Sequence, residues 1–262
     1  MNVSSLAQPT QAAPPPGEPA LELHQLRKAY GDGPNAVVAI EGLDLTVQPG
    51  EFVCLVGASG CGKSTLLHIL SGLDAPTSGR IRMPIGRAAL MFQESALFPW
   101  LTVERNIDLP LKLAGLSKEA RKARVDELLA LVGLRDFAGH RPHQLSGGMR
   151  QRVALVRALA QGARLLLLDE PFAALDAMSR DRLHEELERI WASEKLTVLF
   201  VTHNAREAVR LADRVVMLAP RPGRILSEQR IDLPRPRRIE SAEVAQLAAH
   251  LLDQLKAAHA VD

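Results

Sequence analysis

The segment 57–65, with the sequence GASGCGKST, constrains the fold of this chain more than any other feature. It matches the pattern G-x-x-x-x-G-K-[ST] without a mismatch. It follows an apolar run at 52–56 that predicts a buried strand, and it opens a predicted helix at 63–70. Glycines let backbone N–H groups curl around phosphate oxygens, and the helix N-terminus adds partial positive charge. We therefore expect a nucleotide to be bound by Gly57, Ala58, Ser59, Gly60, Cys61, Gly62, Lys63, Ser64 and Thr65.

A second motif, which is acidic, consists of Asp169 and Glu170 and follows four leucines at 165–168. The leucines predict a buried strand, and ligands of open α/β sheets bind at the carboxyl ends of the strands. We expect Lys63 to reach the β- and γ-phosphates, and Ser64 and Asp169 to hold Mg²⁺, with Asp169 acting through water. Glu170 is then placed to orient or deprotonate the attacking water. Together the two motifs predict binding, and hydrolysis, of a nucleoside triphosphate.

The wider pattern predicts an α/β core. Apolar strand segments at 164–169, 196–202 and 215–218 alternate with helical segments at 182–191 and 205–212, which favours a largely parallel sheet. Alternating apolar residues at 21–26 and 40–47 predict half-buried strands, and helical spacing over 102–134 predicts a helical subdomain. The proline-rich N-terminus, 1–20, predicts a disordered leader that is not a secretory signal. Apolar residues at Val244, Leu247, Leu251 and Leu255 predict one face of a C-terminal helix within 239–262.

Composition narrows the class of protein. The chain has 262 residues, of which 47% are hydrophobic, so it can bury a substantial core. A net charge of +2 does not predict a nucleic-acid partner. Two cysteines do not make a disulfide scaffold and favour a reducing compartment. No run of about 18 apolar residues predicts a membrane span. We therefore expect a soluble intracellular chain, unless it docks onto a partner.

Residues 145–151, with the sequence LSGGMRQ, closely resemble the signature motif of ATP-binding cassette (ABC) proteins. The motif precedes a helical run at 152–159, so its hydroxyl and glycine amides form a second helix N-terminus that favours an anion. The resemblance, which covers 21–233, implies a head-to-tail dimer in which the signature of one ATPase subunit caps the ATP of the other. The signature residues are Leu145, Ser146, Gly147, Gly148 and Met149. Most cassettes have glutamine at the position of Met149, and methionine cannot form glutamine's side-chain hydrogen bonds. The backbone amides at the start of the helix remain available to an anion.

The resemblance extends to further positions and to the fold. Gln93 lies where the family has its Q-loop glutamine, a ligand of Mg²⁺, and Asp176 lies in the D-loop. His203 matches the switch histidine that contacts the γ-phosphate. Tyr30 matches the aromatic residue that stacks on adenine, although the only tyrosine of the chain could equally be a core residue. The implied fold is a P-loop NTPase core with a small antiparallel β subdomain and a helical subdomain. The cassette spans 21–238, and its helical subdomain lies at about 95–150.

Four stretches of the chain point to one group within the family. They are residues 92–103, 149, 221–225 and 233–237, and they resemble the corresponding stretches of the ATPases of nitrate, sulfonate and taurine importers. It implies two integral membrane permease subunits, an indirect link to a substrate-binding protein, and a place on the cytoplasmic face of the inner membrane. Transport direction and substrate are not encoded in residues of this chain. The alternative is a cassette ATPase that powers a different membrane complex or a non-transport process. Repair ATPases insert a long coiled coil before the signature and translation ATPases carry two cassettes, whereas this chain shows neither. Glu170 and His203 argue against a scaffold without turnover.

Three local features leave two interpretations each. Phe98, Pro99 and Trp100 predict a docking surface for the membrane subunits, unless both rings pack into the helical subdomain. The arginine-rich segment 221–238 is interpreted as a solvated linker rather than a contact with anionic headgroups. Cys54 and Cys61 are expected to be free thiols, with Cys54 in the core. The Cys61 thiol is either reactive, because Lys63 and a helix N-terminus favour thiolate, or too buried to react.

Overall fold

The computed structural model describes residues 17–259 of the chain. Most of the predicted leader, 1–16, lies outside the described residues. The last residues of that predicted leader belong to the fold, because Ala20 is buried and its N–H donates to the Val47 carbonyl at 2.8 Å. Among the described residues, no helix is both long and apolar enough to cross a membrane.

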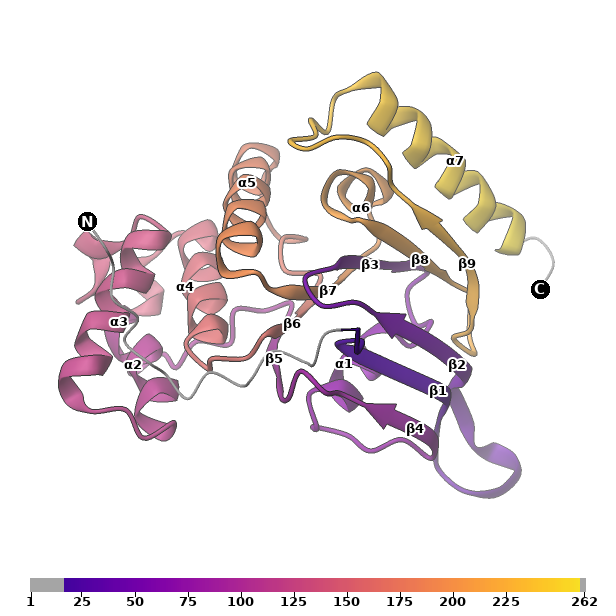
Figure 1. Ribbon diagram of the computed structural model, residues 1–262, viewed down its shortest axis with the longest axis horizontal. Coiled ribbons are helices and arrows are strands. Elements are labelled where there is room, and N and C mark those ends of the chain that lie inside the picture. Colours follow the sequence, from indigo (N-terminus) through magenta and orange to yellow (C-terminus); the bar gives the residue numbers. More distant parts are fainter. Residues whose placement is uncertain (1–16, 260–262) are drawn as a thin grey trace.

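A six-stranded sheet forms the centre of the molecule (Figure 1). In spatial order its strands are β5 (Ala88–Met91), β6 (Leu165–Asp169), β7 (Thr197–Thr202), β3 (Phe52–Gly57), β8 (Arg214–Leu218) and β9 (Ile225–Arg230). The first five are parallel and β9 pairs antiparallel with β8, which confirms the predicted largely parallel sheet. Alternate residues of β3 enter two different cores, Phe52 and Cys54 on one face and Val53 and Leu55 on the other. Burial on both faces explains why these strands are continuous apolar runs.

A smaller antiparallel sheet lies beside the central one (Figure 1). It contains β2 (Val37–Val47), β1 (Leu21–Tyr30) and β4 (Ser78–Arg82), in that order. Helix α1 (Lys63–Leu70) contributes Leu66 and Leu67 to the core that this sheet shares with β3 and β6. The alternation in β1 and β2 matches a sheet with one face buried. The phosphate loop between β3 and α1 is therefore held between two sheets.

Helices cover the opposite face of the central sheet and extend into a helical subdomain (Figure 1). The subdomain begins with α2 (Val103–Leu113) and α3 (Lys118–Leu131), whose N-caps are the hydroxyls of Thr102 and Ser117. Helices α4 (Gly147–Leu159), α5 (Ala177–Glu194) and α6 (Ala205–Leu211) complete this layer. Short 3₁₀ helices occur at Gly33–Asn35, Arg135–Phe137 and Pro142–Gln144. The helical spacing of 102–134 is thus confirmed as two capped helices.

The interpretation of the arginine-rich segment as a solvated linker is wrong, because Ile225–Arg230 form β9 and two of the arginines pack against the core. The other four, Arg221, Arg224, Arg230 and Arg238, are exposed. Arg235 pairs with Glu188 at 2.7 Å and Asp213 at 2.9 Å, and its guanidinium lies 4.4 Å from the centre of the Trp191 ring. Arg237 is buried and donates to five backbone carbonyls, those of Leu233, Val209, Arg210, Ala212 and Ile231. Charged composition predicted solvent here because no pattern along the chain reveals partners that are 20 or more residues away.

Helix α7 (Ala242–His259) follows this segment and packs against α6 (Figure 1). Val244 and Leu251 are buried, and Leu247 and Leu255 pack against the same core, as the apolar stripe predicted. The C-terminal helix is therefore a cover for the central domain.

Candidate nucleotide-binding and catalytic site

The phosphate loop lines an open cleft of about 350 Å³. The cleft lies between the antiparallel sheet, the start of α1 and the end of β6. Its lining residues are Tyr30, Ala39, Ser59, Gly60, Gly62, Lys63, Ser64, Thr65, Glu170 and Arg221. Tyr30 is 43% exposed at the end of β1, with its hydroxyl donating to Asp74, so it is not a core residue. Among the described residues, none of the signature motif lines this cleft.

Lys63 is the first residue of α1 and is buried at the bottom of the cleft. Its Nζ donates to the carbonyls of Gly57 at 2.8 Å and Ala58 at 2.7 Å. Gly62, the N-cap of α1, has a φ of +93°, and a Cβ there would lie 2.7 Å from the Ala39 carbonyl oxygen. Only glycine fits both the conformation and this close approach. The loop therefore presents its amides and the Lys63 ammonium to one concave surface.

Cys61 does not line the cleft, and its side chain is fully buried in the core beneath the loop, with Sγ 3.6 Å from Lys63 Nζ. Of the two interpretations, the buried thiol is the one that the structure supports, because the Cys61 side chain has no exposed surface. Both cysteines are free, and burial raises the pKa of the Cys54 thiol. The sequence placed Cys61 in the loop but could not give the direction of its side chain.

Asp169, the last residue of β6, lies within reach of Ser64. Burial raises the pKa of the Asp169 carboxyl, while a hydrogen bond with Ser64 and the charges of His68 and Lys63 oppose that rise. A buried carboxylate beside a hydroxyl provides oxygen ligands of the kind that Mg²⁺ prefers, so these residues fit the metal. Gln93 lies on an exposed segment after β5, and its backbone carbonyl accepts from Gln151 Nε2 at 3.0 Å.

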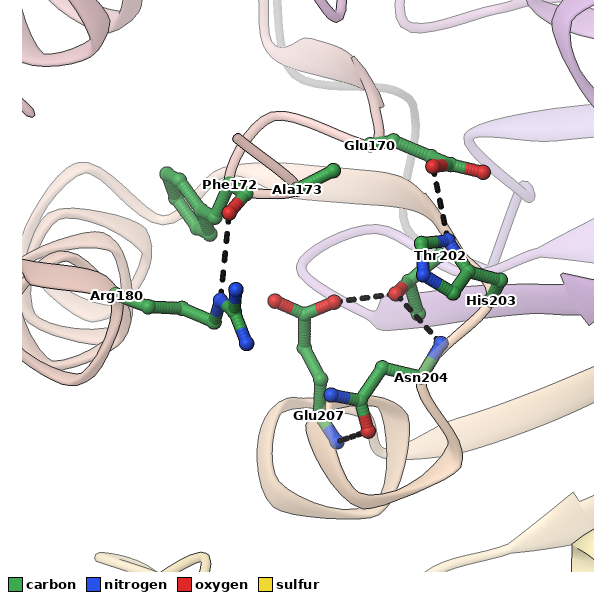
Figure 2. A pocket seen from close by; sticks show the side chains of 8 residues that line it. All are labelled: Glu170, Phe172, Ala173, Arg180, Thr202, His203, Asn204 and Glu207. Atoms are coloured by element: carbon green, nitrogen blue, oxygen red, sulfur yellow. Dashed lines mark hydrogen bonds and ion pairs between the residues drawn. The ribbon is translucent and has the colours of Figure 1, made fainter. Parts of the chain in front are cut away.

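Glu170 and His203 meet at the carboxyl ends of β6 and β7 (Figure 2). His203 Nδ1–H donates to Glu170 Oε2 at 2.9 Å, although the histidine side chain is 62% exposed. Glu170 has a φ of +42°, a backbone conformation that glutamate rarely adopts, and its N–H donates to the Val201 carbonyl at 3.0 Å. The ends of two neighbouring strands therefore bring an acidic and an imidazole side chain together, Glu170 after β6 and His203 after β7.

A buried polar network supports His203 from behind. Thr202 Oγ1 donates to Glu207, and the second oxygen of that carboxylate bonds His184 Nε2 at 2.6 Å. Arg210 donates to His184 Nδ1 at 3.1 Å, which leaves the Nε2 proton for Glu207. Thr202, His203 and Glu207 line a small pocket of about 40 Å³ together with Glu170 (Figure 2). The sequence analysis missed this network, whose polar residues lie on three separate elements.

The signature motif forms the start of α4. Ser146 is its N-cap, and its hydroxyl accepts from the Met149 N–H at 3.2 Å, so one helix-entry amide is already bonded within the chain. Asp176 caps α5 in the same way by accepting from the Ser179 N–H at 2.9 Å. Backbone hydrogen bonding with Ser179 lowers the pKa of Asp176. Leu145 is buried, and Gly147 and Gly148 carry no side chain that would crowd the helix entry.

Three further residues belong to the site although the sequence analysis did not place them there. Ala39 and Arg221 line the cleft, and Gln151 connects the signature helix to Gln93. The sequence analysis placed Arg221 in the arginine-rich segment and in a stretch that resembles importer ATPases, but neither feature predicted that it lines the cleft. Gln151 is the last residue of the signature stretch 145–151. Its place in that motif was the only feature of the sequence that could have predicted a role in the site.

Comparisons with known proteins agree with this geometry. A family model described as ABC transporter matches residues 40–173, just over half of the chain. The aliphatic sulfonates import ATP-binding protein of Agrobacterium fabrum is 45% identical over 246 residues, covering 93% of this chain and 86% of that protein. The nitrate import ATP-binding protein of Synechocystis is 44% identical, covering 82% of this chain and 83% of that protein.

A solved ATP-binding cassette, a dimer in a post-hydrolysis state with ADP and phosphate bound, has the same fold with a TM-score of 0.72. It is 32% identical, and the match covers 82% of this chain and all of that chain. The expected cassette fold, with its antiparallel β subdomain, is thereby confirmed. From its motifs, its fold and these relatives, the chain belongs to the family of ABC transporter ATP-binding proteins and is an ATPase that hydrolyses ATP to ADP and phosphate.

Proposed function

We propose that this chain is the ATPase subunit of an importer for a small anion such as an aliphatic sulfonate, nitrate or taurine. The observation that carries the import proposal is the pair of sulfonate and nitrate import relatives, each about 45% identical over most of both chains. The substrate would not touch this subunit, so the proposal concerns the energy supply of the importer. We expect the ATPase to lie on the cytoplasmic face of the membrane that holds the permease.

The cleft binds ATP with the adenine on the Tyr30 ring and the phosphates on the loop from Ser59 to Thr65. Tyr30 is fixed for this role by its hydroxyl bond to Asp74 at 2.9 Å and by Lys28, whose Nζ lies 4.7 Å from the ring centre. Lys63 exchanges its two carbonyl contacts for the β- and γ-phosphate oxygens. Mg²⁺ held by Ser64, Asp169 and Gln93 would neutralise charge on those phosphates.

Hydrolysis uses Glu170 as the base that orients the attacking water and accepts its proton. His203, which follows the neighbouring strand β7, contacts the γ-phosphate. The 2.9 Å hydrogen bond between Glu170 and His203 supports this assignment. At that spacing Glu170 can hold the water while His203 contacts an oxygen of the phosphate that the water attacks. The bond between Thr202 and Glu207 fixes the residue before His203 and so directs the imidazole.

Two chains act head to tail, with the signature of each chain completing the cleft of the other. The cleft of one chain contains, among the described residues, no signature residue, and this supports a site completed in trans. Asp176, which begins α5, lies at the D-loop where the two chains would meet. The dimeric form of the solved cassette is consistent with this arrangement.

Docking to the membrane subunits uses the surface formed by Phe98, Pro99 and Trp100. The Trp100 side chain is 66% exposed, and Phe98 is only partly buried, so neither ring is packed into the subdomain interior. The segment that leads to this surface is bonded to the signature helix. Gln151 donates to the Gln93 carbonyl, and Arg157 donates to the Ser95 and Ala96 carbonyls at 3.1 and 2.7 Å. Movement of the signature helix is thereby coupled to the docking surface.

Replacing the catalytic glutamate should separate binding from hydrolysis. Glu170→Gln keeps the shape and removes the base, so ATPase turnover should fall roughly 10²–10⁴-fold, while ATP binding persists. Glu185→Gln on α5, whose side chain is 75% exposed, is the matched control and should retain wild-type turnover. Release of phosphate by the purified variants measures the effect. Turnover of Glu170→Gln close to wild type would remove the assigned role.

Complementation between two inactive chains tests the trans site. Ser146→Arg blocks the signature and Lys63→Ala disables the phosphate loop, so each homodimer should be inactive. In an equal mixture half of the dimers are mixed, and each mixed dimer has one site without a lesion, so about a quarter of wild-type ATPase activity should return if the two sites turn over independently. Absence of recovery in samples where native mass spectrometry detects mixed dimers would contradict facing sites.

The docking surface predicts a binding defect without an ATPase defect. Trp100→Ser should weaken binding to inverted membrane vesicles carrying the permease by roughly 30-fold, as for a buried aromatic hot spot. ATPase activity of the isolated chain should stay within about twofold, because Trp100 lies outside the cleft. Leu113→Ser, at an 80% exposed apolar residue of α2, serves as control. Equal vesicle binding of both variants would place the interface elsewhere.

Growth and uptake test the substrate class. A strain that lacks this chain should lose uptake of one small anion, tested as taurine or an alkanesulfonate for sulfur and as nitrate for nitrogen. The wild-type gene should restore uptake, and Glu170→Gln should not, although it accumulates to the same level. Uptake of all three anions at the rate of the parent strain would overturn the import proposal and leave the ATPase assignment intact.

A further inference from the structure

The turn between β8 and β9, residues 219–224, reaches the nucleotide cleft. Arg221 from this turn is exposed and lines the cleft together with Tyr30, Ser59 and Lys63. It is the only residue of the turn that lines the cleft among those that the structure describes. A cationic side chain from a distant part of the sequence thus faces the same space as the phosphate loop.

Backbone hydrogen bonds fix this turn to β2, and Gly223 packs closely against the phosphate loop. The Gly223 N–H donates to the Ala39 carbonyl at 2.9 Å, and the Gly223 carbonyl accepts from the Glu41 N–H at 3.1 Å. A Cβ at Gly223 would lie 2.2 Å from the Cys61 carbonyl oxygen, so no other residue could approach the loop this closely. Because Arg221 is only two residues away, its position relative to the loop is set by these contacts.

The charges around the cleft favour an anion beside Arg221. Within residues 17–259, no ion pair or side-chain hydrogen bond engages the Arg221 guanidinium. Lys63 and Arg221 are the two cationic residues that line the cleft, against the single carboxylate of Glu170.

We propose that Arg221 binds the phosphate chain of the nucleotide held by the phosphate loop of its own chain. A guanidinium donates paired hydrogen bonds to phosphate oxygens, and it keeps its charge at any physiological pH. It would add a second cationic contact to the one that Lys63 makes, because both residues line the same cleft. In this chain the turn after β8 is therefore a second phosphate-binding segment.

Binding of MgADP, which is not hydrolysed, tests the proposal on the purified full chain. Arg221→Gln should raise the Kd for MgADP about tenfold, the lower part of the range for a charged hydrogen bond. The defect should shrink as salt rises, because the contact is exposed. Arg224→Gln removes the same charge from the same turn without lining the cleft, and its Kd should stay within about twofold of wild type. Competition with a fluorescent adenine nucleotide provides the measurement.

Two further arms distinguish a phosphate contact from other effects. The Kd for adenosine, which has no phosphate, should be the same in Arg221→Gln and wild type, and Arg221→Lys should recover part of the MgADP affinity. Unchanged MgADP affinity in Arg221→Gln would overturn the proposal. An equal loss for adenosine, or an equal loss in Arg224→Gln, would also overturn it, because the effect would then come from the nucleoside or from the turn.

Discussion

Close backbone contact at two glycines holds the nucleotide cleft together. Gly62 lets the Ala39 carbonyl approach the start of α1, and Gly223 lets the turn after β8 lie against the Cys61 carbonyl. Three segments therefore meet: Ala39 of β2, the phosphate loop after β3, and the turn after β8. A side chain at either glycine would separate them, because the nearest atoms are backbone atoms that cannot rotate away. The width of the cleft depends on this contact.

Because these glycine contacts hold the two sheets together, each sheet contributes different residues to the nucleotide cleft. The central sheet supplies the phosphate loop and, at the end of β6, Asp169 and Glu170. The antiparallel sheet supplies Tyr30 and the wall at Ala39. Because α1 packs between the sheets, its N-terminus is aimed into the gap that the sheets leave open. Glu170, bonded to His203, lines the same cleft where β6 ends.

Polar contacts extend from this site toward two surfaces: the one around Trp100, where the membrane subunits would dock, and the start of α5, where a second ATPase chain would bind. Gln151 and Arg157 of α4 hold the backbone of the segment 93–96 that leads to Trp100. His184 of α5 and Glu207 of α6 are buried together behind His203. Both connections are hydrogen bonds between elements that are far apart in the chain, and both depend on long side chains that are partly or fully removed from water. Such bonds are directional, so a shift of α4 or α5 changes the position of the residues that they hold.

The sequence by itself determined the phosphate loop, the acidic strand end, the signature helix and the alternation of strands and helices around β6, β7 and β8. These features are local, because glycine positions, caps and apolar runs act on neighbouring residues, and so a pattern is enough to predict them. Tertiary structure alone decided that Arg237 is buried, that the Cys61 thiol points into the core and that Arg221 faces the cleft. Each of these depends on which distant carbonyl, carboxylate or backbone segment lies beside the residue. The pairing of β8 with β3 and with β9 sets those neighbours, and composition along the chain does not record it.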